Sequence, residues 1–326
     1  MTRHFLTVAD LAPDELAEVL ELAATPPPSP YDVARGAPGV LAGRGVALVF
    51  EHPSARTRNA CELAVVQLGG HPVTIRGEEV GIDKRESAED VARTLGCYHA
   101  LIAARVERHA TLERMAGAVD SVGLSVPIVN LLSDREHPTQ AIADLLTIRQ
   151  HFGDLAGRTL AYVGDGNNVC RSLVGAAVAM GLAVRVASPA GYGLSDTFSP
   201  LALPHGSSVE IGSSPEEAVA GADVVYTDVW VSMGQDEEVW VRRRAFSGYS
   251  VDEALVAKAA AHAIVLHCLP AHRGEEISAG VMSGRHSLVW QQAANRMHAT
   301  RGLFAFLLAK TSADPHRAPH GLEVVS

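Results

Sequence analysis

The sequence predicts an α/β protein with two domains, each built on a parallel β-sheet, and three observations support this. The chain has 326 residues, enough for two cores of ordinary size. Apolar β-rich runs alternate with helical segments, a pattern typical of parallel sheets covered by helices on both faces. A strong helical pattern over residues 135–153 separates a first set of strands from a second. We therefore expect two Rossmann-like domains joined by long helices, with a small-molecule cleft between them.

The first domain is expected over residues 1–134. It begins with a helix over 11–24, which has Pro13 and acidic residues in its first turn. One later helix opens at Ser87 with a capping-box-like start. The strands are the apolar runs at 45–50, 71–75, 99–104 and 126–132.

The second domain is expected over residues 154–286, after the linking helix at 135–153. One of its helices opens at Ser214, where an N-cap, an N1 proline and a capping box coincide. A long amphipathic helix over 287–309 is expected to pack back on the first domain, and the tail at 310–326 is expected to fray. The strands are the apolar runs at 158–164, 182–188, 223–229 and 263–269.

Composition narrows the function classes. Hydrophobic residues make up 47% of the chain and charged residues 20%, typical of a globular protein. The net charge of −10 argues against a nucleic-acid partner, which needs a basic surface. The four cysteines are scattered, and the chain shows neither a signal-like start nor an apolar run of membrane-spanning length. We therefore expect a cytoplasmic protein with no membrane partner.

The stretch Ser54-Ala55-Arg56-Thr57-Arg58 places charge and hydroxyl groups where a strand turns into a helix. Ligands of parallel sheets bind at the carboxyl ends of strands, and helix N-termini favour anions. A hydroxyl and an arginine fork suit a phosphate, so we interpret the stretch as an anion site. The alternative is a solvated helix start with a serine cap.

Other segments show weaker chemical patterns. His137 and Gln140 share one face of the linking helix. Gly164-x-Gly166 follows a strand and suggests a dinucleotide site, but a third glycine is absent and Ser188 stands where an acidic residue is expected. Asn167 and Asn168, which follow it, are better suited to a small polar ligand.

Two strand ends carry groups that could react or bind a metal. Asp228 follows one strand, and His267 and Cys268 follow another. Adjacent residues of a strand point to opposite faces, so His267 and Cys268 are not expected to share a zinc ion, and no metal is expected. A cysteine nucleophile is compatible with this pattern but not required by it.

Taken together, the motifs resemble those of the ornithine carbamoyltransferase family over nearly the whole chain. Their order along the sequence is more specific than any one of them. The motifs are SARTR (54–58), HPTQ (137–140), GDGNN (164–168), DVWVSMG (228–234), HCLPAHRGEE (267–276) and NRMH (295–298).

The resemblance implies a role for each matching residue in transfer of a carbamoyl group from carbamoyl phosphate to L-ornithine. No cofactor is implied, and the family's homotrimer is a further expectation. The phosphate would be held by Ser54, Ala55, Arg56 and Thr57. The catalytic set would be Arg105, His137, Cys268 and Arg296, the two arginines and the histidine binding the phosphate or carbonyl oxygen. The carbamoyl amide would be held by Gln140 and the main chain of Cys268 and Leu269, and the amino-acid end of ornithine by Asn168, Asp228, Ser232 and Met233.

The chain departs from the family pattern at four positions. Ala55 replaces the threonine of the usual STRTR, and Gly81 replaces a common glutamine. Asn59 stands in place of a phenylalanine, and Ala294 in place of a glutamate. Either the backbone amide of residue 55 supplies the phosphate contact, or the chain is a paralogue with weaker donor affinity or another acceptor.

Several function classes follow from these observations. The leading one is synthesis of citrulline and phosphate, a step of arginine synthesis. A second is carbamoyl transfer to a modified ornithine, lysine or putrescine, although Asp228 favours an acceptor with an α-amino-acid end and disfavours aspartate. An NAD-dependent dehydrogenase rests on Gly164-x-Gly166 alone. A non-catalytic homologue would require a broken carbonyl-polarising set, and that set is intact.

Overall fold

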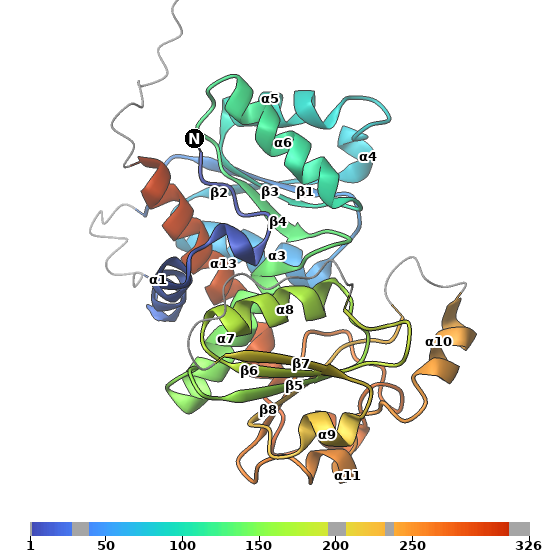
Figure 1. The fold of residues 1–326 in the computed structure, drawn as a ribbon. Helices are drawn as coiled ribbons and strands as arrows, with labels where there is room; N and C mark the ends of the chain where they lie inside the picture. Colours follow the sequence, from blue (N-terminus) through green and yellow to red (C-terminus); the bar gives the residue numbers. More distant parts are fainter. Residues whose placement is uncertain (1, 28–38, 195–206, 232–237, 313–326) are drawn as a thin grey trace, which may run out of the picture.

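The computed structural model describes residues 2–27, 39–194, 207–231 and 238–312, and it contains two parallel sheets stacked one above the other (Figure 1). The first is four-stranded, in the order β2-β1-β3-β4, and every pair in it is parallel. Its strands match the four predicted apolar runs. They are β1 (Gly45–Phe50), β2 (His71–Arg76), β3 (His99–Arg105) and β4 (Ile128–Leu132).

Alternating side chains of the central strand β1 enter two different cores. Val46 and Leu48 belong to the cluster that continues toward the second sheet. Ala47 and Val49 pack instead into a cluster beneath α5 (Ala88–Tyr98) and α6 (His109–Ser121), which cover the outer face in Figure 1. A strand buried on both faces needs a continuous apolar run, which is why GVALVF does not alternate with polar residues.

The second sheet is five-stranded and also wholly parallel, in the order β7-β6-β5-β8-β9. Both sheets confirm the predicted fold class. Four strands were predicted, while β7 (Ser208–Gly212) was missed because this edge strand is largely exposed and carries no apolar run. The other strands are β5 (Thr159–Val163), β6 (Ala183–Ala187), β8 (Val224–Thr227) and β9 (Ile264–His267).

The helix starts follow the local signals of the sequence. The Ser87 hydroxyl accepts a hydrogen bond from the Asp90 N–H at 3.1 Å, and Ser214 accepts one from the Glu217 N–H at 3.2 Å. The linking helix α7 (Pro138–Phe152) begins three residues later than predicted, because a proline is favoured at the first helical position. The remaining helices are η1 (Val8–Asp10), α1 (Pro13–Ala24), α3 (Ala55–Gln67), α4 (Gly77–Val80), α8 (Asn168–Ala179), α9 (Pro215–Val219), α10 (Val239–Ala245), α11 (Glu253–Val256), α12 (Ala279–Met282) and α13 (Val289–Ser312).

Helix α13 carries the end of the described chain back to its beginning. It lies beside α1 along one side of the molecule (Figure 1). A Cβ at Gly302 would lie 2.5 Å from the Ala23 nitrogen, so only glycine allows this close approach. The buried Arg301 donates hydrogen bonds to the Ala23 carbonyl at 3.0 Å and to Gln67 Oε1 at 2.8 Å. These contacts hold α13 in place against α1 and α3. None of the described helices is long and apolar enough to cross a membrane.

Candidate functional site

The start of α3 combines a helix N-terminus with hydroxyl and guanidinium groups. Because β1 ends at Phe50, this helix begins at the carboxyl edge of the first sheet, as the sequence predicts. The Ser54 hydroxyl caps it by accepting a hydrogen bond from the Thr57 N–H at 3.4 Å. Thr57 is buried, and its Oγ1 accepts a 2.7 Å hydrogen bond from Nη2 of Arg296 on α13. The first-turn N–H groups and this guanidinium together favour an anion here.

Three arginines and a histidine from distant segments form a basic cluster beside this helix start: Arg56, Arg105, His137 and Arg296. Burial, followed by the charges of Arg296 and Arg56, lowers the pKa of Arg105 to about 10. His137 is buried, and burial together with the charges of the three arginines holds the pKa of its imidazole well below 6.5. The imidazole is therefore neutral at neutral pH, and the cluster concentrates positive charge suited to a phosphate.

The first turn of α7 brings two of the predicted residues to this cluster. His137 is the N-cap and Gln140 follows three residues later, 5% and 1% exposed respectively. Among the residues that the structure describes, neither His137 Nδ1 nor Gln140 Oε1 has a hydrogen-bond partner. Buried polar atoms are nearly always satisfied, so both atoms are candidates to contact a ligand.

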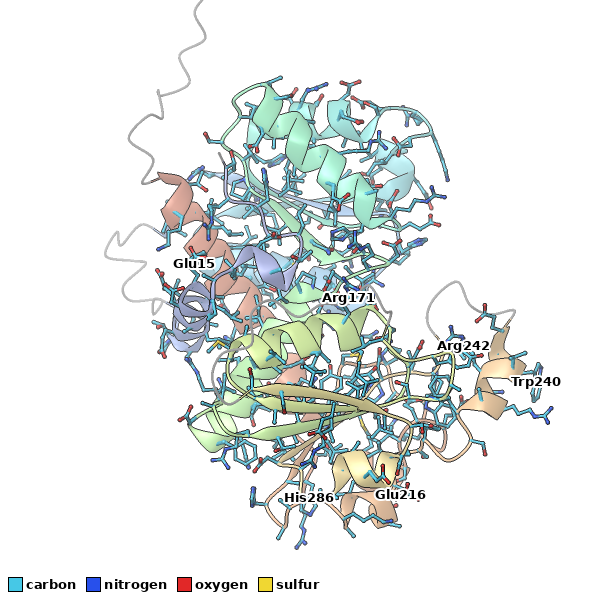
Figure 2. All side chains as sticks on the ribbon, in the orientation of Figure 1. Glu15, Arg171, Glu216, Trp240, Arg242 and His286 are labelled. Atoms are coloured by element: carbon cyan, nitrogen blue, oxygen red, sulfur yellow. The ribbon has the colours of Figure 1, made fainter. Side chains whose placement is uncertain are left out.

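A buried polar junction fixes α7 relative to the second sheet. The His137 N–H donates to Ser172 Oγ on α8 at 2.8 Å, and that hydroxyl donates a short hydrogen bond to Glu136. Arg171, labelled between the two sheets in Figure 2, donates from Nε to Glu136 Oε1 at 2.8 Å. Burial raises the pKa of Glu136 against the opposing effects of Ser172 and Arg171. No pattern in the sequence indicates this junction, which ties the position of His137 to α8.

The second sheet contributes an acid and a thiol at the ends of adjacent strands. Asp228 follows β8 and Cys268 follows β9, and Cys268 Sγ donates to Asp228 Oδ1 at 2.9 Å. Burial and the Asp228 charge raise the pKa of the thiol well above its ordinary value, while the charge of Arg296 lowers it. Cys268 is therefore a thiol at neutral pH. Arg296, which hydrogen-bonds Thr57, also acts on this thiol through its charge.

The two asparagines at the start of α8 have different partners. Asn167, not Asn168, reaches the acid: its Nδ2 donates to Asp228 Oδ2 at 2.8 Å. Asn168 Nδ2 donates instead to the Ser133 carbonyl at 2.7 Å. The N-cap role of Asn167, whose Oδ1 accepts from the Val169 and Cys170 N–H groups, aims its amide at Asp228. Asn168 thus joins the two halves of the molecule rather than contacting Asp228.

The backbone after β9 is held in an unusual conformation. Leu269 has a φ of 65° and precedes a cis peptide bond to Pro270. Its N–H donates to His267 Nδ1 at 2.9 Å, so the proton of this imidazole is on Nε2, which lies 3.0 Å from Glu276 Oε1. Both His267 and Glu276 are buried. This pair fixes the direction of the Cys268–Leu269 main chain.

The structure brings three possible metal ligands closer than strand alternation predicts. Ligand atoms of Asp228, His267 and Cys268 lie within 4.8 Å of one another, because β9 ends at His267 and the chain turns there. Both nitrogens of His267 already have partners, in the Leu269 N–H and Glu276. Binding an ion would break one of these hydrogen bonds.

Two cavities lie outside the basic cluster. One of about 350 Å³ adjoins the start of α3 and is lined in part by Ser54, Ala55 and Arg58. The other, about 470 Å³, is lined by α11, α12 and His286, which is labelled at the bottom of Figure 2. Neither cavity is lined by Arg56, Arg105, His137 or Arg296, so the chemistry of the side chains, not the cavity size, identifies the site.

Three positions named in the sequence remain: the predicted site residues Ser232 and Met233, and Gly81, which departs from the family pattern. Ser232 and Met233 lie outside the described residues. Gly81 ends α4 in the left-handed conformation, with a φ of 58°, and a Cβ there would lie 2.9 Å from Arg85 Cγ. Glycine suits this position, so any side chain that reached from it would require a different local backbone.

Two parallel-sheet domains, with a basic cluster suited to an anion and an acid–thiol pair at the ends of β8 and β9, define the class of this α/β protein. Residues 3–150 match the model for the aspartate/ornithine carbamoyltransferase carbamoyl-P binding domain, and residues 156–307 match that for the Asp/Orn binding domain. The chain belongs to the aspartate/ornithine carbamoyltransferase family.

Individual relatives agree with this assignment. The chain is 49% identical to an ornithine carbamoyltransferase of Acidothermus cellulolyticus, covering 94% of this chain and 97% of that one. It is 42% identical to one of Archaeoglobus fulgidus, over 95% and 99%. Among solved structures, the ornithine carbamoyltransferase of Pyrococcus furiosus has a TM-score of 0.85 at 38% identity, over 94% and 97% of the two chains. That of Thermus thermophilus has a TM-score of 0.81 at 40% identity, over 94% and 99%.

Proposed function

We propose that this chain transfers the carbamoyl group of carbamoyl phosphate to the δ-amine of L-ornithine, giving L-citrulline and phosphate. The observation that carries the proposal is the position of Arg296, which hydrogen-bonds Thr57 at the helix start and whose charge lowers the pKa of the Cys268 thiol at the end of β9. One guanidinium thus contacts the anion site and acts electrostatically on the thiol. The match to both family domains supports the same reaction.

On the donor side, phosphate oxygens accept hydrogen bonds from the first turn of α3 and from nearby side chains. The amide of Ala55 replaces the hydroxyl that a threonine would offer there. Arg105 and Arg296 neutralise the phosphate charge. The phosphate-binding residues in this proposal are Ser54, Ala55, Arg56 and Thr57.

The reaction itself is attack of an uncharged amine on the carbamoyl carbon. The C–N bond forms as the carbonyl π bond opens to an oxyanion, and the C–O bond to phosphate then breaks, with the amine proton passing to the departing phosphate. His137, Arg105 and Arg296 stabilise the oxyanion, as neutral and charged donors do in a water-poor site. His137 acts as a donor in its neutral form because its pKa is held low. No electrons are transferred, so this chemistry calls for no redox cofactor.

On the acceptor side, Asp228 pairs with the α-ammonium of ornithine, and the Cys268 thiol lies near the δ-nitrogen. Asp228 already accepts hydrogen bonds from Cys268 and Asn167, which fix its carboxylate. Ornithine must present its δ-nitrogen as a free amine, and the nearby arginines disfavour the ammonium form. The remaining proposed contacts to the amino-acid end are Asn168, Ser232 and Met233.

Three finer points belong to the same proposal. The enzyme acts in the cytoplasm, in arginine biosynthesis, and it assembles as a homotrimer, in line with the family. A second candidate function is carbamoyl transfer to a modified ornithine, lysine or putrescine, favoured only by the altered donor motif at Ala55 and Gly81. Putrescine has no α-ammonium or carboxylate, so it would leave Asp228 unpaired.

The test is an amine panel assayed for ureido product with carbamoyl phosphate as donor. L-Ornithine should give the highest kcat/KM, and the isosteric variant Asp228→Asn should raise the KM for ornithine more than about tenfold, the cost of one charged contact. The matched control is Asp223→Asn at the opposite end of β8, where the acid accepts from the Thr159 N–H. This control should leave the KM for ornithine and the KM for carbamoyl phosphate unchanged. Absence of turnover with every amine, in a folded sample, would defeat the proposal.

A further inference from the structure

A second acid, fully buried, sits one turn along α7 from Gln140. Asp144 is 0% exposed and its carboxylate accepts three hydrogen bonds. Oδ1 accepts from Gln140 Nε2 at 2.8 Å and from Gln292 Nε2 at 2.7 Å, while Oδ2 accepts from the Tyr226 hydroxyl at 3.1 Å. Gln292 and Tyr226 are buried as well. In its ionised form this carboxyl group is an acceptor only, so each group facing it must present a donor.

The orientation of both amides follows from this network. Gln292 Oε1 accepts from the His267 N–H at 2.8 Å, so its amide nitrogen must face Asp144. Gln140 has no such second bond, and its orientation depends on Asp144 alone among the described residues. With its nitrogen donating to Asp144, its oxygen is the end left for a ligand.

We propose that Asp144 is a positioning residue that turns the Gln140 amide so that its oxygen, and not its nitrogen, meets the carbamoyl group. This inference rests on the proposed function. A carbamoyl NH₂ group offers two donors, so an oxygen facing it forms a hydrogen bond and a nitrogen facing it does not. Asp144 thereby selects a carbamoyl donor over an acyl donor of the same shape, such as acetyl phosphate, whose methyl group would leave Gln140 Oε1 unpaired.

The double variant Asp144→Asn/Gln292→Glu isolates this role because it exchanges donor and acceptor in the network without changing the buried charge. The carboxylate introduced at position 292 would accept from the His267 N–H, as Gln292 Oε1 does, and would need the NH₂ group at position 144 on its side. That NH₂ group would also face Gln140, which then turns its oxygen toward position 144, while the new amide oxygen accepts from Tyr226. The single variant Asp144→Asn would instead set an NH₂ group against Gln292 Nε2, or leave Gln140 as it is.

The experiment compares the dissociation constants of freshly prepared carbamoyl phosphate and acetyl phosphate by calorimetry at pH 8, above the pKa of Asp144 of about 7. Wild-type protein should prefer carbamoyl phosphate, and Asp144→Asn/Gln292→Glu should reduce that preference by roughly ten- to hundredfold, mainly by weakening carbamoyl phosphate. The control is Thr147→Val, on the same helix as Asp144. This near-isosteric change removes the buried hydrogen bond that Thr147 Oγ1 accepts from Asn295 on α13. It should leave the preference unchanged.

Adding Gln140→Met to Asp144→Asn/Gln292→Glu should give the same preference as Gln140→Met alone, because residues acting through one contact are non-additive. Equal weakening of the two ligands in Asp144→Asn/Gln292→Glu, or additive losses in the triple variant, would overturn the inference. Should the double variant fail to fold, Gln140→Met decides: retention of the preference overturns the inference. A wild-type protein that prefers carbamoyl phosphate yet makes no citrulline would refute the proposed function and leave the inference standing.

Discussion

In the ligand-free protein, we expect the buried charge of Arg296 to lower the free energy of unfolding. Arg296 is 8% exposed, and burial is the main cause that lowers its pKa, with the charge of Arg56 acting in the same direction. No carboxylate ion pair to Arg296 is present among the described residues. Replacing it by methionine removes one hydrogen bond to Thr57, worth about 1 kcal/mol, and relieves a buried charge whose removal returns about 1–4 kcal/mol. We therefore expect Arg296→Met to unfold at a slightly higher temperature than wild type without ligand.

Phosphate should stabilise the wild-type protein more than Arg296→Met, and so narrow or reverse this difference. At a phosphate concentration of about 100 times the wild-type Kd, binding adds about 2.7 kcal/mol to the wild-type stability. Loss of one charge-assisted contact weakens affinity about ten- to hundredfold, which leaves Arg296→Met an increment of only about 0.4–1.4 kcal/mol at the same concentration. Thermal unfolding with and without inorganic phosphate, followed by circular dichroism, measures both increments.

The matched control is Arg301→Met, one turn further along α13. Arg301 is buried too, but it holds α13 to the Ala23 carbonyl and to Gln67. Its loss should lower stability in the absence of ligand and leave the phosphate increment intact. An Arg296→Met protein that is markedly less stable than wild type and keeps the full increment would refute the assignment of Arg296 to the anion site.

Three further predictions concern single residues. Ala55→Thr should change the KM for carbamoyl phosphate by less than about threefold if the backbone amide makes the contact; a gain of tenfold or more in steady-state assays would favour a specialised paralogue instead. Burial raises the pKa of Asp144 to about 7, against 3.8 in the unfolded chain. Because the folded state binds this proton more tightly, the contribution of Asp144 to the stability of the fold decreases as the pH rises from about 4 to 7. Asp144→Asn should therefore gain stability relative to wild type between pH 5 and pH 8 in urea unfolding, by at most about 3 kcal/mol, and an unchanged difference would contradict the raised pKa. Iodoacetamide should label the exposed Cys97 well before the buried Cys268 thiol, and mass spectrometry showing the reverse order would indicate a thiolate at Cys268.

The strands and helix starts were predictable because each depends on a short local pattern. A strand buried on both faces must be a continuous apolar run, and a helix start needs a cap, so β1 and the helix after Ser87 could be identified directly. The strand β7 has no such pattern, since it lies at a sheet edge with its side chains largely in solvent. Its existence depends on pairing with β6, which is a property of the assembled sheet.

The site residues were predictable as types but not as partners. The sequence placed Asn167 and Asn168 together, and only the capping geometry of α8 shows that Asn167 faces Asp228 while Asn168 bonds the Ser133 carbonyl. Asp144 did carry a local signal. It is a lone acid in the apolar run AIADLLTI, where a charge without a partner would be costly. Such an acid predicts a buried donor set, although the sequence cannot name its members.

Two buried acids, Glu136 just before α7 and Asp144 within it, fix the two residues at the start of this helix that are proposed to face the ligand. Glu136 and Ser172 fix the backbone of His137 against α8, and Asp144 fixes the side chain of Gln140 from the opposite end of the same turn. Both ligand-facing groups are thereby held from behind by buried acids that do not themselves face the anion. This arrangement keeps negative charge near the site without placing a carboxylate against the phosphate. His137 itself stays neutral, because burial and then the charges of the three arginines hold the pKa of its imidazole well below 6.5. A neutral donor and fixed amide are what an oxyanion and a carbamoyl NH₂ group require, so the specificity of this site resides as much in α7 as in the SARTR stretch that binds the phosphate.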